Sequence, residues 1–435
     1  MKAGIKQHLI RIAVILAGSA IIGTLLLILV FCIPTKAMKR NVARSLGDMI
    51  KSEEQVPDNA FSRYIWANKE TYTDAIMVQN AIEKIKGKNV YEHAMWVYHS
   101  DLEPEFWTPE ASVKAYCEEE ASDNMYLHEY SRYWHGYLIY LKPLLLIFSW
   151  SQIVTLGAVI QLLLMLAVLI VSIRKKQAGV GIAMLIGFLS MKPALILASL
   201  TMSVCWGITL LALLYMLLCH ERLEGKGIYP EFFLLIGIFT AYFDFLTYPI
   251  VTLGFPLCAY FLISRKCTLK QSIQKIIGYC TCWGIGYAGM WACKWLIADI
   301  TLHTGTIKDA LWSILGRTEA IGGRPRMNGG FYVISLNLQE YKWELYTAAA
   351  IVLLLLVLAA LVLAACKTSV KAVLFRVVPF IIIFCIPFAW IVVVQHHSAL
   401  HARFTFRIIG VAVLAMCCIV ISGLQMLKKP EKSGK

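Results

Sequence analysis

Charged side chains are scarce in this sequence of 435 residues: they account for 16% of it, whereas hydrophobic side chains account for 59%. Soluble globular domains carry about 25% charged residues. The sequence also lacks the patterns GxxxxGK[ST], HExxH and CxxC, and it has no GxGxxG between a strand and a helix. These absences argue against a soluble nucleotide-binding enzyme and against a dedicated zinc site.

Long apolar stretches are abundant instead. Several contain about 20 consecutive apolar residues, which is enough to cross roughly 30 Å of hydrocarbon as a helix. None of them alternates with a period of two, so only helices would satisfy the backbone within lipid. The expected spans are 12–33, 153–173, 178–197, 201–219, 228–246, 249–264, 276–298, 346–365, 377–395 and 405–426. We therefore expect an all-α fold, a polytopic helical membrane protein with about ten transmembrane helices.

A polar segment interrupts this pattern directly after the first expected span. Residues 34–135 contain 12 basic and 17 acidic residues, a net charge of −5, whereas the rest of the chain carries 29 basic and 10 acidic residues, or +19. Of the 29 basic residues outside this segment, 19 cluster at alternate span boundaries, which the positive-inside rule assigns to the cytoplasm. This clustering explains the positive net charge without a nucleic-acid partner.

The charge pattern predicts a domain organisation in which both termini lie in the cytoplasm and the chain spans the cell membrane. The expected parts are an N-terminus and first helix (1–33), an extracytoplasmic loop with interfacial helices (34–150), a helical bundle (151–426) with an outer loop (299–345), and a basic tail (427–435). One group of basic residues does not follow the positive-inside rule, because it lies after the first span on the expected outside: Lys36, Lys39, Arg40 and Arg44.

Asp74 is the candidate catalytic residue of the polar loop. It lies at the start of an expected amphipathic helix, 71–82, whose apolar face includes Ile76, Met77 and Ala81. Thr71 and Asp74 have the spacing of a capping box, so a helix cap is the plainer interpretation. A carboxylate held at a helix N-terminus above the membrane could also act as a general base, and the two roles are compatible.

Two further clusters are expected on the same outer surface. Asp244 and Tyr248 lie at a turn between two spans, where a solvated turn acid is the plainer interpretation. Arg403 and Arg407 open the last span four residues apart, which predicts one shared helical face. Guanidinium groups there could bind a phosphate in a bidentate manner, or simply contact lipid headgroups.

Histidines and buried lysines complete the candidates. His397 and His401 share a helical face, but neither has a carboxylate three or four residues away, so we expect no metal site. Lys192 and Lys294 lie within apolar stretches, where a cation must face a cavity or snorkel.

The layout resembles the GT-C superfamily of membrane glycosyltransferases, which take sugars from polyprenyl-phosphate donors. The resemblance covers most of the chain as topology, and its usual signature is an acid in the first outer loop, here Asp74, with Asp48 as the other candidate. The segments Tyr72–Met77, Ser131–Tyr137, with Arg132 and His135, and His397–Arg407 are also similar to bacterial membrane proteins of this kind.

The resemblance implies an inverting sugar transfer, with lipid and a polyprenyl-phosphate-linked sugar as partners. Asp74 would take the proton of the acceptor, Arg403 or Arg407 would hold the departing phosphate, and a lid at 317–330 would close over the sugar. Some members of the superfamily use a divalent metal, but this loop shows no ligand cluster, so no cofactor is expected. A transporter or flippase is the main alternative, and a non-catalytic scaffold is a third.

Overall fold

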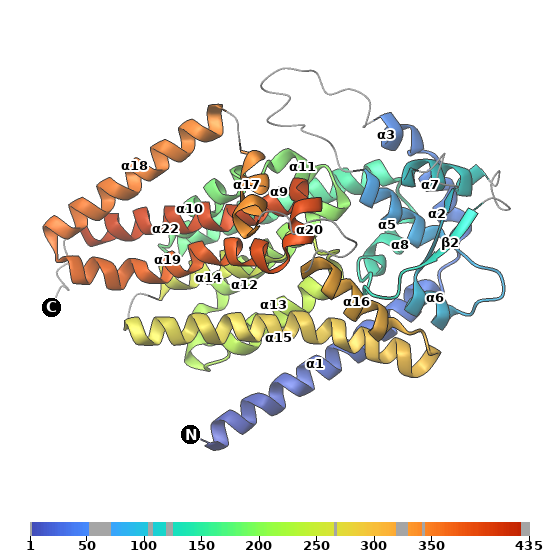
Figure 1. Ribbon diagram of the computed structural model, residues 1–435, viewed down its shortest axis with the longest axis horizontal. Helices are drawn as coiled ribbons and strands as arrows, with labels where there is room; N and C mark the ends of the chain where they lie inside the picture. The colour runs from blue at the N-terminus through green and yellow to red at the C-terminus, as the bar shows by residue number, and fades with distance from the viewer. Residues whose placement is uncertain are drawn as a thin grey trace.

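The computed structural model describes residues 2–51, 71–102, 108–118, 125–264, 268–318, 329–341 and 344–427. It is an all-α structure with one small sheet (Figure 1). Six helical stretches within these residues are long and apolar enough to cross a membrane. They belong to α1 (Lys2–Phe31), α9 (Trp150–Arg174), α12 (Leu200–Gly225), α18 (Glu344–Lys367), α19 (Val370–Val393) and the run Ala402–Leu427, which ends in α22 (Gly410–Leu427).

The other expected spans coincide with apolar helices that are shorter or more polar. Three of them have 12 to 15 residues: α10 (Ala178–Leu189), α13 (Tyr229–Phe243) and α14 (Ile250–Ile263). The fourth, α15 (Leu269–Leu302), has 34 residues and carries several polar side chains. Length and composition therefore qualify six helices as spans, against the ten that we expected.

Glycines allow α13 and α15 to pack at very close range. A Cβ atom on Gly237 of α13 would overlap the carbonyl oxygen of Trp283, and one on Gly286 of α15 would overlap that of Leu234. Each glycine thus faces the backbone of the other helix. Small residues at such crossings let membrane helices gain close van der Waals contact.

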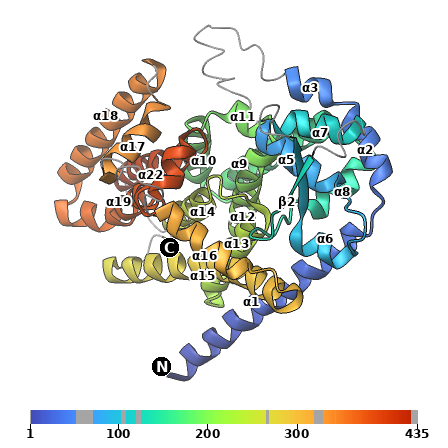
Figure 2. The same ribbon diagram turned by 45° about the vertical axis from the view of Figure 1, so that its right-hand side comes forward.

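The described parts of the polar segment and α8 fold into a compact domain at one end of the bundle, and we call it the outer domain for that position (Figure 1). Its elements are α2 (Thr35–Ala43), α3 (Leu46–Lys51), α5 (Tyr72–Ile82), α6 (Val90–Trp96), β1 (Tyr98–Leu102), α7 (Pro109–Glu118), β2 (Met125–Glu129) and α8 (Leu138–Leu145). The strands pair antiparallel, with His99 opposite His128. Both termini of the chain lie away from this domain, and α18 and α19 lie on the opposite side of the bundle (Figures 1 and 2).

Helix α8 packs inside this domain, within the segment for which we expected interfacial helices. Leu138, Leu141 and Leu145 are buried, and so is the amine-bearing side chain of Lys142. Nζ of Lys142 donates a hydrogen bond of 2.6 Å to the carbonyl oxygen of Ala81 at the C-terminal end of α5. A cation at that end of a helix is favourable because the last carbonyl groups carry partial negative charge.

Short helices connect the longer ones at the end of the bundle that meets the outer domain. They are α11 (Pro193–Leu197), α16 (Thr306–Thr318), α17 (Gly329–Gln339), α20 (Gln395–Leu400), α21 (Ala402–Thr405) and the 3-10 helix η1 (Phe406–Ile409). Residues 319–328 of the expected lid and 428–435 of the basic tail lie outside the described residues.

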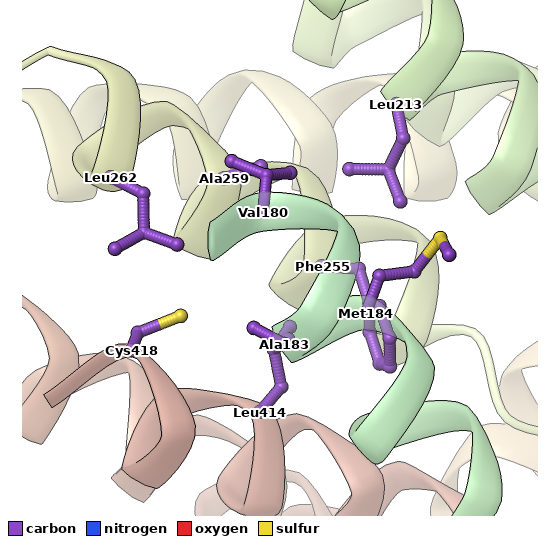
Figure 3. A pocket seen from close by; sticks show the side chains of 9 residues that line it. All are labelled: Val180, Ala183, Met184, Leu213, Phe255, Ala259, Leu262, Leu414 and Cys418. Carbon is purple, nitrogen blue, oxygen red and sulfur yellow. The ribbon is translucent and has the colours of Figure 1, made fainter. Parts of the chain in front are cut away.

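A small gap in the packing lies within the bundle, away from the outer domain. Side chains of α10, α12, α14 and α22 surround it, among them Met184, Leu213, Phe255 and Cys418 (Figure 3). Its volume is about 10 Å³, room for about one water molecule, and its lining is apolar. We interpret it as a packing defect rather than a binding site.

Candidate functional site

A larger cavity, of about 240 Å³, lies where the outer domain meets the bundle. We call it the junction cavity. The outer domain contributes residues from the start of α5 and from the turn after β2, and the bundle contributes the turn after α13, the end of α16, α20 and α21. Its lining comprises Tyr72, Thr73, Ile76, Tyr130, Tyr133, Phe245, Leu246, Thr247, Arg317, His396, His397, Leu400, His401 and Phe404.

The lining combines one guanidinium, three imidazoles and five aromatic rings, and none of the described residues that line it is a carboxylate. Arg317 donates a hydrogen bond to the hydroxyl of Tyr133. The rings of Tyr130, Tyr133 and Phe245 lie with centroids 5.1 to 6.1 Å apart. Such a cavity suits an anionic group next to a flat, partly apolar one, because the cation attracts charge and the rings offer faces.

Asp74 lies beside this cavity but its carboxylate reaches into the bundle. The side chain is fully buried. Oδ1 accepts hydrogen bonds from Ser199 Oγ (2.9 Å) and from the backbone nitrogen and the hydroxyl of Thr201 (2.9 and 2.8 Å). Oδ2 accepts bonds from the backbone nitrogen of Leu200 (2.8 Å) and from Nε1 of Trp150 (3.3 Å). Asp74 thus caps the N-terminus of α12, a helix far from it in sequence.

The expected capping box at the start of α5 is absent. Thr71 precedes α5 but no side-chain hydrogen bond caps the helix there. The prediction that Asp74 caps a helix was right, but the helix was wrong. Asp74 caps α12 rather than α5, the helix to which it belongs. Burial raises the pKa of Asp74, while its five donors oppose that rise. Both carboxylate oxygens already accept hydrogen bonds, so the geometry gives Asp74 a positioning role. Its assignment as a general base stays a prediction.

Asp244 and Tyr248 are also buried, which differs from the solvated turn that we expected. Asp244 accepts hydrogen bonds from the backbone nitrogen (2.9 Å) and the hydroxyl of Thr247, and so holds the turn between α13 and α14. Tyr248 donates its hydroxyl hydrogen to the carbonyl of Met202. Thr247 lines the junction cavity. Asp244 and Tyr248 therefore support one wall of the cavity without lining it.

His397 and His401 both line the junction cavity, with ring centroids 4.6 Å apart. Nε2 of His397 lies 3.0 Å from the carbonyl oxygen of Leu246. A carbonyl can only accept, so this nitrogen carries the hydrogen and Nδ1 is left as the acceptor. Burial lowers the pKa of His397 to about 3. Burial and the positive charge of Arg317 lower the pKa of His401, so both rings are neutral at pH 7.

Arg403 and Arg407 do not form the pair that we expected on one helical face. Arg403 is exposed, whereas Arg407 is 2% exposed. The chain turns from α21 into the 3-10 helix η1 between them, and Nη1 of Arg407 folds back to the carbonyl oxygen of Arg403 at 2.6 Å. Neither arginine lines the junction cavity. The prediction of a shared face was wrong because it assumed a continuous α-helix.

The buried lysines contact protein groups. Nζ of Lys192 lies 2.8 Å from a carboxylate oxygen of Glu340. Nζ of Lys294 donates to the carbonyl oxygens of Ala94 (3.3 Å) and Met95 (2.8 Å) at the C-terminal end of α6. Lys294 therefore caps a helix of the outer domain from the bundle.

Arg132 and His135 hold the turn that leads from β2 to α8. Arg132 pairs with Asp309 of α16 at 2.6 Å. His135 is buried, with Nε2 at 2.8 Å from the carbonyl of Tyr130 and Nδ1 at 3.1 Å from the hydroxyl of Tyr137. Burial lowers its pKa to about 3, so its role is to fix the turn. Both residues position Tyr130 and Tyr133 in the cavity wall.

Four lining residues were not predicted from the sequence: Arg317, Tyr72, Thr73 and Phe245. Arg317 stands at the first position of the expected lid, and Tyr72 and Thr73 adjoin Asp74, so position along the chain was the available signal. Among the residues described, no group of three or more histidine, cysteine, aspartate or glutamate side chains could hold a metal ion. Asp48, the alternative acid, is exposed on α3.

Comparisons with known proteins leave the family of the chain open. No family model, no curated protein and no solved structure matches it.

Proposed function

We propose that this chain transfers a sugar from a polyprenyl-phosphate donor to an acceptor at the extracytoplasmic face of the bacterial plasma membrane. The observation that carries the proposal is the junction cavity, which is lined by a guanidinium, imidazoles and aromatic rings and lies where an outer domain meets a bundle of apolar helices. A donor with an apolar tail, a phosphate and a sugar has matching chemistry.

Each part of the donor has a corresponding group in the cavity. Arg317 would bind the phosphate, because a guanidinium offers paired donors in the plane that phosphate oxygens occupy. Tyr130, Tyr133 and Phe245 would contact the sugar ring through their faces. No metal is invoked, and a divalent ion bound together with the donor phosphate is compatible with the same arrangement.

The proposed reaction makes one bond and breaks one bond at the anomeric carbon. The acceptor hydroxyl attacks that carbon, the bond from the carbon to the phosphate oxygen breaks, and the polyprenyl phosphate leaves with the electron pair. The acceptor's proton passes to the neutral imidazole of His401, which lines the cavity. Arg317 stabilises the charge of the departing phosphate, which is the larger contribution to a transfer of this kind.

The proposed topology has the outer domain outside the cell and both termini in the cytoplasm. It counts α10, α13, α14 and α15 as further crossings, which gives ten. Short helices can cross as part of a bundle that thins the bilayer locally or shields their ends. The clustering of lysine and arginine at alternate span boundaries supports this orientation.

A matched pair of arginine variants tests the function. We expect Arg317→Gln to lower sugar transfer at least about tenfold, because a charge-assisted contact to phosphate is worth roughly 1.5–3 kcal/mol. Arg44→Gln removes the same charge from an exposed site on the outer domain and should leave transfer unchanged. The surface glycans of a deletion strain complemented with each variant, analysed by mass spectrometry, provide the measurement.

Two results would contradict the proposal. One is a deletion strain whose surface glycans match those of the parent. The other is full activity of Arg317→Gln at a normal membrane level. The transporter alternative predicts a different pattern: purified chain in vesicles would move a lipid-linked sugar between leaflets without joining the sugar to an acceptor.

A further inference from the structure

Helix α16 exposes large apolar side chains that a helix surrounded by water would normally bury. Its large apolar side chains point outward: Leu311 is 54% exposed, Trp312 61% and Leu315 46%. The side chains of α16 that are fully buried, Thr306 and Ala310, are small. The hydroxyls of Thr306 and Ser131 lie 2.7 Å apart in that interior contact. A helix that faces water normally buries its apolar stripe.

The inner face of α16 packs against the far end of α15. Ala310, Ser313 and Arg317 share a small gap with Trp291 and Trp295 of α15. The ion pair between Arg132 and Asp309 fixes the first half of the helix to the outer domain. The position of α16 is therefore set by the level that Trp291 and Trp295 occupy along α15.

That level can be estimated from the inner end of α15. Lys275 pairs with Glu224 there at 2.7 Å, among the basic residues of the expected cytoplasmic side. Trp295 lies 20 residues further along, which at 1.5 Å per residue is about 30 Å, the thickness of the hydrocarbon layer. Trp291 and Trp295 thus lie at the outer boundary of the bilayer, where tryptophan is commonly enriched.

We propose that α16 is a membrane-surface helix whose exposed face, formed by Leu311, Trp312 and Leu315, inserts among the lipids of the outer leaflet at headgroup level. The lipid surface accounts for a face that would be unfavourable in water, since contiguous exposed apolar side chains mark contact sites. On α15, Leu296 and Ile300 near the same end of the helix are also exposed, by 51% and 65%.

The inference connects the membrane surface with the junction cavity. Arg317, in the last turn of α16, forms part of the cavity wall, so the helix that contacts lipid also carries the cavity's guanidinium. A lipid-borne phosphate at headgroup level would approach the cavity at the depth where Arg317 lies. The membrane contact rests on the proposed topology and holds whatever reaction the cavity supports.

Site-specific photocrosslinking tests the lipid contact in the full-length chain. A photoreactive amino acid replaces Leu311 or Leu315, and the protein is placed in nanodiscs of phosphatidylethanolamine and phosphatidylglycerol. Leu354, 52% exposed in the middle of α18, is the lipid-facing reference. Lys114, exposed on α7 of the outer domain, is the water-facing reference.

We expect positions 311 and 315 to crosslink lipid at least about fivefold more than position 114 and at a yield nearer that of position 354. Yields nearer that of position 114 would overturn the proposal. Crosslinks to a second copy of the chain in place of lipid would also overturn it, and would identify the face as a contact between protomers. Because no reaction is measured, these outcomes are independent of the test with Arg317→Gln.

Discussion

At the scale of single residues, three buried charged side chains of this protein bind the ends of helices. Asp74 meets the N-terminus of α12, and Lys142 and Lys294 meet the C-termini of α5 and α6. In each pair the sign of the side chain is opposite to the partial charge of the helix end. These contacts satisfy both the charge and the free backbone groups that every helix end leaves.

The role of Asp74 can be tested by Asp74→Asn. The amide group of asparagine would face donors that now point at a carboxylate oxygen, so at least one buried donor loses its acceptor. We expect a loss of about 3 kcal/mol in the free energy of unfolding, measured by denaturation in detergent micelles. Asp48→Asn, on an exposed surface, is the control. Unchanged stability together with lost sugar transfer would instead favour Asp74 as the base.

Glu83 gives the outer domain a dependence on pH. The side chain is 3% exposed and accepts hydrogen bonds from Ser100 (3.0 Å) and Gln79 (3.3 Å). Burial raises its pKa from an ordinary 4.5 to about 7. The folded state therefore binds a proton more tightly than the unfolded state, so stability should fall as pH rises from about 4.5 to about 7, by up to roughly 3 kcal/mol.

Glu83→Gln should remove most of this slope, because glutamine stays neutral throughout the range. Glu129→Gln, on an exposed position of β2, should keep it. Thermal unfolding followed at several values of pH between 4.5 and 8 provides the measurement. An equal slope in both variants would show that another group titrates in this window.

At the scale of elements, the crossing of α13 and α15 depends on two glycines. A methyl group on Gly286 would overlap the backbone of α13, which cannot rotate away as a side chain could. Gly284 on the same helix has open space around its Cα atom. We expect Gly286→Ala to cost about 2 kcal/mol or more through overpacking, and Gly284→Ala to be neutral or to stabilise by up to about 1 kcal/mol.

The unfolding midpoints of the two variants in the same detergent give the comparison. Equal midpoints would mean that the helices separate without cost, and would contradict the close crossing.

The sequence predicts local elements well where one periodic pattern dominates. The apolar spacing of 71–82 predicted α5, and the long apolar runs predicted α9 and α18 within a few residues. The run 12–33 predicted the end of α1 but not its start at Lys2. Arg407 shows where local reasoning fails: the helix tightens to a 3-10 turn at Phe406, and a four-residue spacing no longer places two side chains on one face.

The junction cavity could not be predicted from the sequence because its walls come from segments up to about three hundred residues apart. Tyr72 and His401 meet there only after α5 docks on α12 and α16 packs along α15. No pattern near Asp74 indicates that its partners are Ser199 to Thr201. The short strands β1 and β2 were missed for the same reason, since five-residue strands stabilise each other through pairing rather than through local preference.

At the scale of the whole molecule, the outer domain and the bundle form one folding unit. Asp74 reaches from the domain into the bundle, and Lys294 reaches from the bundle into the domain. Between them, the aromatic side chains of Trp134 and Tyr137 are fully buried. Separation would expose both charges to water but would also leave two helix ends without partners.

This reciprocal capping has a practical consequence for immunology and protein production. If residues 34–150 were produced alone, α6 would lose the Lys294 amine at its C-terminal end, and the Asp74 carboxylate would be exposed to water without its partner helix α12. Antibodies raised against such a fragment would recognise surfaces that the intact chain buries. Immunisation should therefore begin with the complete chain in micelles or nanodiscs.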